Sequence, residues 1–95
     1  MPELSFRVRW PDDSTTLCYS PSSTIREAFV PGHPYPVAEF VSRSTAALEH
    51  ASRRVAEKYG YGCGHAQAQI REIQSLAAPF AADPQARVIV ESFEN

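Results

Sequence analysis

The 95-residue chain lacks the features that mark several common classes of protein. Nine lysine and arginine residues stand against eleven acidic ones, and this net charge of −2 argues against nucleic acid as the main partner, because phosphate binding needs clustered basic residues. The first twenty residues contain no apolar run, so we expect no secretory signal, and no stretch approaches the length of a membrane span. The sequence therefore predicts a cytoplasmic protein without a membrane anchor.

Cysteine is scarce. Cys18 and Cys63 are the two cysteines, and without an export signal we expect reduced thiols rather than a disulfide. The string Cys63-Gly64-His65 lacks the paired ligand spacing of zinc sites. The sequence therefore predicts no metal and no cofactor.

What the chain does have is enough apolar material for one core. Hydrophobic side chains make up 43% of the residues and charged ones 21%, which is typical of a globular protein, and the length is too short for two cores. We expect a single domain spanning residues 1–95.

Three segments have the pattern of β-strands. Residues 4–10 alternate strictly between apolar and polar side chains, and residues 15–20 alternate again after the turn sequence Pro11-Asp12-Asp13-Ser14. This pattern predicts a hairpin. Residues 87–93 form the third predicted strand. Its run of apolar residues is typical of a strand that is covered on both sides or of one whose outer face meets a partner.

Two longer segments have helical periodicity. Apolar residues recur every three or four positions from Pro36 to Tyr59, and again from Ala66 to about Ala78. Between them lie three of the four glycines, and Gly60 is expected to end the first helix in a left-handed conformation. The proline-rich residues 31–36 predict an extended loop or a set of turns, and residues 22–29 a short helical turn.

The order strand, strand, helix, helix, strand predicts an α+β fold of two layers. We expect a three-stranded, mainly antiparallel sheet with both helices packed on one face, and the last strand beside the first. The inner face is expected to collect these residues: Phe6, Val8, Trp10, Leu17, Tyr19, Val88 and Val90. The outer face is expected to carry these: Arg7, Arg9, Thr16, Cys18, Ile89, Glu91 and Phe93. Two large apolar groups, Ile89 and Phe93, beside Arg7 and Arg9 then predict an interface for another protein or another copy of the chain.

The glycine-rich joint is the second candidate site. A helix start lowers the pKa of a thiol, so Cys63 is a candidate nucleophile, and His65 could act as its base or as a metal ligand. The structural alternative is that the glycines shape a tight turn and Cys63 packs as a small apolar residue.

Short matches run in order along the whole chain. They begin at Phe6-Arg7-Val8-Arg9-Trp10-Pro11-Asp12 and continue through Cys18-Tyr19-Ser20-Pro21, Lys58-Tyr59-Gly60 and Ala86-Arg87-Val88. In these segments the chain resembles a small bacterial family described as nitrogen starvation response proteins. The resemblance extends to Cys63 but not to His65. It implies a role in a nitrogen-linked pathway, because members are typically encoded beside a nitrilase, a radical-SAM protein, an acetyltransferase and a flavoprotein.

These observations predict a non-enzymatic accessory protein that acts through protein contacts, either by self-association or by docking to proteins of the same gene cluster. The alternative is a small metabolite-binding protein or a thiol-dependent enzyme that uses Cys63. That alternative predicts a thiol that reacts much faster than free cysteine at neutral pH.

Overall fold

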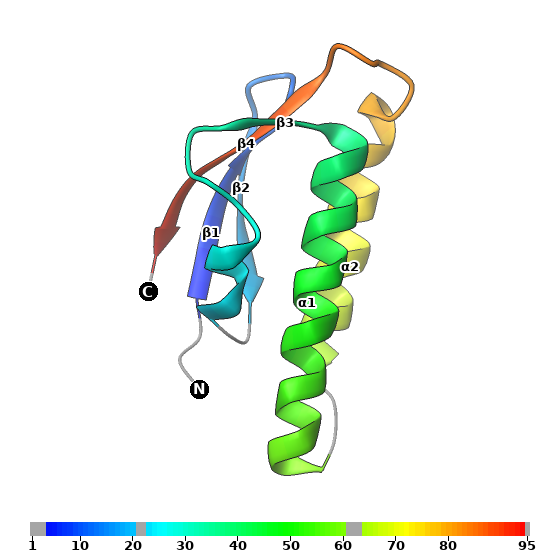
Figure 1. The fold of residues 1–95 in the computed structure, drawn as a ribbon. Helices are drawn as coiled ribbons and strands as arrows, with labels where there is room; N and C mark the ends of the chain where they lie inside the picture. Colours follow the sequence, from blue (N-terminus) through cyan, green and yellow to red (C-terminus); the bar gives the residue numbers. More distant parts are fainter. Residues whose placement is uncertain (1–3, 21–22, 61–63, 95) are drawn as a thin grey trace.

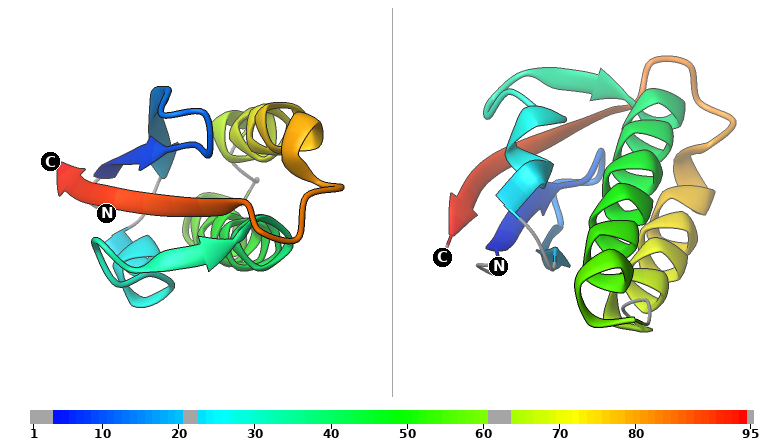
Figure 2. Two further views of the ribbon diagram at one scale, coloured as in Figure 1. Left: turned by 90° about the horizontal axis from the view of Figure 1, so that it is seen from above. Right: turned by 60° about the horizontal axis from the view of Figure 1, so that its bottom comes forward.

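The computed structural model describes residues 4–20, 23–60 and 64–94. It has an α+β fold in which a four-stranded antiparallel sheet is packed against two helices (Figure 1). The strands lie in the order β2 (Thr15–Ser20), β1 (Leu4–Arg9), β4 (Arg87–Glu94) and β3 (Pro34–Pro36). The two helices lie side by side on one face of the sheet (Figure 2). The fold class and the position of the helices are as predicted, whereas the prediction of three strands is wrong.

The N-terminal hairpin pairs β1 (Leu4–Arg9) with β2 (Thr15–Ser20). Asp12 accepts hydrogen bonds from the backbone N–H and the hydroxyl of Ser14, and the turn places Arg9 opposite Thr15. Because of this register, odd-numbered residues of both strands share the outer face. The predicted faces of β2 are therefore reversed: Leu17 lies outside, opposite Arg7, and Cys18 lies inside, opposite Phe6.

The unexpected fourth strand is β3 (Pro34–Pro36), which pairs with the beginning of β4. Proline has no N–H to donate, so a Pro-Tyr-Pro segment can pair only at the edge of a sheet. Between the two exposed prolines, the side chain of Tyr35 is buried, and its hydroxyl accepts a hydrogen bond from the Val30 N–H at 2.8 Å. The buried tyrosine anchors what the sequence alone presents as a loop.

The last strand, β4 (Arg87–Glu94), pairs with β1 as predicted, but its ladder contains a β-bulge. Val8 faces Val90, whereas the preceding residue Arg7 faces Ser92, so one extra residue is inserted in β4. Beyond this point the side chains exchange faces, and Phe93 lies opposite Phe6 against the core. The prediction that Phe93 lies on the outer face is therefore wrong.

The helical layer consists of α1 (Val37–Tyr59) and α2 (Gly64–Ala77), with single 3₁₀ turns at η1 (Ser23–Glu27) and η2 (Ala78–Phe80). Gly60 has φ +84°, which confirms the predicted left-handed end of α1. Trp10 connects the sheet to the helical layer. Its ring meets the Phe40 ring edge-on, with 5.5 Å between the ring centroids, and stacks on the Phe80 ring, with 6.5 Å between the centroids.

Among the residues that the structure describes, no helix has the length and apolar character needed to span a membrane.

Candidate interaction surface on the outer sheet face

The structure describes only part of the predicted site at the glycine-rich joint. Cys63 lies outside the described residues. His65, in the first turn of α2, is exposed, and its ring meets the Tyr19 ring edge-on at 5.8 Å. Within residues 4–20, 23–60 and 64–94, no three His, Cys, Asp or Glu side chains are grouped as metal ligands would be. A role for Cys63 or His65 stays a prediction.

The other cysteine, Cys18, is a free thiol held in the interior. Burial, followed by the negative charge of Glu72, raises the pKa of the Cys18 thiol to about 12 from its ordinary value of 9.0. A thiol with this pKa is almost fully protonated at neutral pH, and the thiolate is the nucleophilic form. Cys18 therefore acts as a small core residue.

Gln69 makes a contact that the sequence did not reveal. It lies on the buried side of α2, and its Oε1 accepts a hydrogen bond from the Tyr19 backbone N–H at 2.8 Å. This bond ties α2 to the edge strand β2. A polar residue among the apolar positions Ala66, Ile70 and Ile73 was the available signal.

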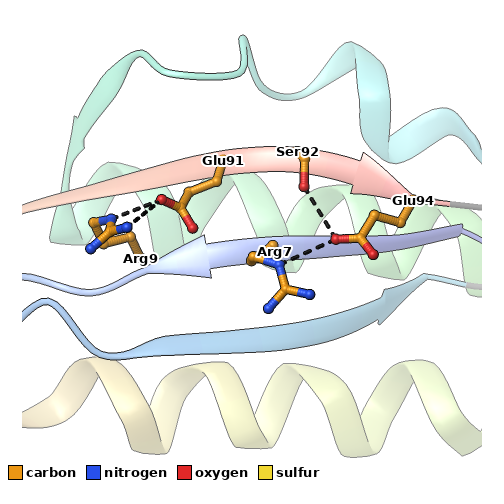
Figure 3. Close-up of polar contacts among 5 residues, drawn as sticks. All are labelled: Arg7, Arg9, Glu91, Ser92 and Glu94. Carbon is orange, nitrogen blue, oxygen red and sulfur yellow. Dashed lines mark hydrogen bonds and ion pairs between the residues drawn. The ribbon is translucent and has the colours of Figure 1, made fainter.

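The outer face carries a cluster of four charged side chains on two neighbouring strands. Arg9 binds Glu91 through both Nε and Nη2, at 2.8 and 2.7 Å, and Arg7 Nε lies 3.2 Å from Glu94 Oε2. Figure 3 shows both arginines reaching from β1 to a glutamate on β4. Both basic groups thus belong to β1 and both acidic groups to β4. We call these four residues the charged rows.

These ion pairs remain in contact with water. The arginine side chains are each 41% exposed, and those of Glu94 and Glu91 are 43% and 28% exposed. Pairs exposed to this extent contribute at most about 1 kcal/mol to stability, because water screens the attraction and fixing two long side chains costs entropy. Stability alone is a weak reason for these charges, and they remain available to a binding partner.

Apolar groups flank the charged rows. Leu17, on β2, is 51% exposed and lies opposite Arg7. Ile89, on β4, lies opposite Arg9 and is half-buried. Four residues were predicted to form the interface. The structure places Arg7, Arg9 and Ile89 together on the outer face, whereas Phe93 lies on the inner face against the core. Leu17 and Glu94 were missed, and both depend on strand register.

An apolar groove of about 380 Å³ lies elsewhere, between the beginning of α1 and the end of α2. Small and apolar side chains line it, among them Val37, Val41 and Ala77, with Ser42 and Gln74 as its polar groups. Its lining residues carry no charge. The groove therefore lacks a charged group that would fix the orientation of a polar metabolite.

Comparison with known proteins gives one match over nearly the whole chain. The family model described as nitrogen starvation-induced protein NitG matches residues 5–93. The chain belongs to this family. No curated protein and no solved structure matches the chain.

The NitG match confirms the predicted relationship to nitrogen starvation response proteins. It spans every strand and helix of the structure except the first residue of β1 and the last of β4. Arg7, Arg9 and Glu91 lie within the matched region, and Glu94 lies one residue beyond it. The outer sheet face is thus almost entirely part of the NitG region.

Proposed function

We propose that this NitG-family protein is a non-enzymatic accessory protein of the cytoplasm, which serves a nitrogen-linked pathway by binding a protein through the outer face of its sheet. The observation that carries the proposal is the one-sided packing of the fold. Both long helices cover the inner face, and no other described element lies over the outer one (Figure 2).

The composition of the outer face supports protein binding. Arginine is enriched in protein interfaces, and the guanidinium groups of Arg7 and Arg9 are held in place by their carboxylate partners. Leu17 adds an exposed apolar side chain beside them. A surface with arginines held in fixed positions and an adjacent apolar group can bind a partner with little loss of side-chain entropy.

Affinity capture from nitrogen-starved cells tests this proposal. The bait is the wild-type chain, the Arg7→Glu/Arg9→Glu variant, or the Arg53→Glu/Arg54→Glu variant, whose two arginines are exposed on α1. Both variants change the net charge by the same amount. We expect the wild type and the α1 variant to retain the same protein, and the outer-face variant to retain at least tenfold less.

Circular dichroism checks that all three baits are folded. If the folded outer-face variant retains its partner as well as the wild type does, the binding surface lies elsewhere and the proposal is wrong. The proteins encoded in the same gene cluster, which the family resemblance implies, are the first to be sought among the captured chains.

A further inference from the structure

We infer that the protein bound by the outer sheet face is a second copy of this chain, packed face to face about a two-fold axis. This inference rests on the proposed use of that face. It follows from the arrangement of the charged rows, with two positive groups on β1 and two negative groups on the neighbouring strand β4.

A two-fold axis that runs parallel to the strands, midway between β1 and β4, exchanges these two strands. It places β1 of each copy over β4 of the other, so that Arg7 and Arg9 of one copy lie over Ser92 and Ile89 of its partner. The neighbouring outward charges on that strand are Glu91 and Glu94. The surface is therefore complementary to itself in charge, as an isologous interface requires. Face-to-face sheets whose strands are nearly aligned are also a common packing arrangement.

Other symmetric arrangements are less favourable. An in-plane axis perpendicular to the strands and crossing β1 would place β1 over β1 and bring like charges together, which costs energy. The remaining outward charge on β4 is Arg87, at its beginning, and its Nη1 donates to the carbonyl oxygens of Pro84 and Ala86. The charged rows thus favour the axis parallel to the strands.

Charge reversal tests this arrangement. The variant Arg7→Glu/Arg9→Glu makes both rows negative, and Glu91→Arg/Glu94→Arg makes both positive. The fourfold variant combines these changes, so that it exchanges the rows and can re-form the ion pairs within the chain. Sedimentation equilibrium at low salt measures the mass of each, and Arg53→Glu/Arg54→Glu is the control with the same charge change as the first variant.

We expect the 10.5 kDa wild-type chain to approach twice its mass as concentration rises. Each double variant should associate at least tenfold more weakly, while an equimolar mixture of the two should associate, and the fourfold and control variants should behave like the wild type. Raising the salt to about 0.5 M should weaken wild-type association, because screening shortens the range of the charge interaction. Circular dichroism confirms folding, and the single variants Arg9→Glu and Glu91→Arg replace any double variant that is unfolded.

A monomeric wild type, or a fourfold variant that fails to associate, would overturn the inference. If the wild type is monomeric while the captured partner depends on Arg7 and Arg9, the outer face binds a different protein, and the proposed function survives without the dimer. If the reversals change neither association nor capture, both proposals are wrong.

Discussion

Burial between the sheet and the helices keeps the Cys18 thiol protonated. Its side chain is 1% exposed, on the inner face of β2, and Glu72 of α2 adds a negative charge nearby. A thiolate in that position would lose its hydration and be repelled by the carboxylate. The folded protein therefore favours the protonated thiol. Because of this preference, the free energy of unfolding is expected to fall as the pH becomes alkaline.

The pKa of Cys18 gives a prediction about stability. Because the folded-state pKa of about 12 exceeds the ordinary value of 9.0, its contribution is complete below pH 9 and is lost as the pH rises toward 12. Two chains that both lack the other cysteine are compared, Cys63→Ser and Cys63→Ser/Cys18→Ala. Between pH 9 and 12 the free energy of unfolding of the first should fall more steeply than that of the second, by up to about 1.4 kcal/mol per pH unit. Urea denaturation at pH 8, 9 and 10 measures the difference. Parallel pH profiles would show that burial of Cys18 does not shift its pKa.

The bulge in β4 decides which side chains reach the outer face. It places Phe93 beside the core, where the Arg26 guanidinium lies 5.9 Å from the ring centroid, and leaves Ser92 and Glu94 outside. Without the extra residue, side chains would alternate regularly along β4. Phe93, three positions after the inward-facing Val90, would then project outward, as the sequence predicted. A change of one residue in the pairing therefore removes an aromatic group from the proposed interface.

Phe93 should therefore stabilise the fold rather than bind a partner. Phe93→Ala should lower the free energy of unfolding by about 1–3 kcal/mol, less than for a fully buried phenylalanine because the ring is half-buried. Leu17→Ala, on the outer face, is the matched control and should cost less than about 1 kcal/mol. Urea denaturation at neutral pH measures both. Equal losses in the two variants would contradict the assignment of Phe93 to the inner face.

Local patterns predicted the elements that depend on neighbouring residues. The alternation in β1, the periodicity of α1 and the glycine that ends it are properties of short segments, and the structure confirms them. The strand β3 could not be predicted in this way, because it exists only through pairing of Tyr35 with Val88, far away in the sequence.

The candidate surface was also predictable only where it depends on local sequence patterns. Arg7 and Arg9 follow from the alternation of β1, whereas the exposure of Leu17 depends on the register of the hairpin, and the position of Glu94 depends on the bulge. The ion pairs join residues more than eighty positions apart. The alternation pattern therefore predicted Arg7, Arg9 and Glu91 on the outer face, but neither Glu94 nor the ion pairs that join the two strands.

At the scale of the whole fold, the two helices cover one face of the sheet, and no element among the described residues covers the other. The buried cluster includes side chains from both helices and all four strands, and it lies entirely on the covered side. The two exposed large apolar residues of the described chain are Leu17, on the uncovered face, and Val30, in the segment between η1 and β3. This pair allows the central claim to be tested at two positions of similar chemistry.

Photo-crosslinking in nitrogen-starved cells tests most directly whether the outer face binds a protein. A photoreactive amino acid replaces Leu17 in one chain and Val30 in another, at sites that are 51% and 63% exposed. We expect the chain labelled at position 17 to form a crosslinked protein product, with twice the mass of the chain if the partner is a second copy. Position 30 should form little of it. A product from position 30 with none from position 17 would contradict the account.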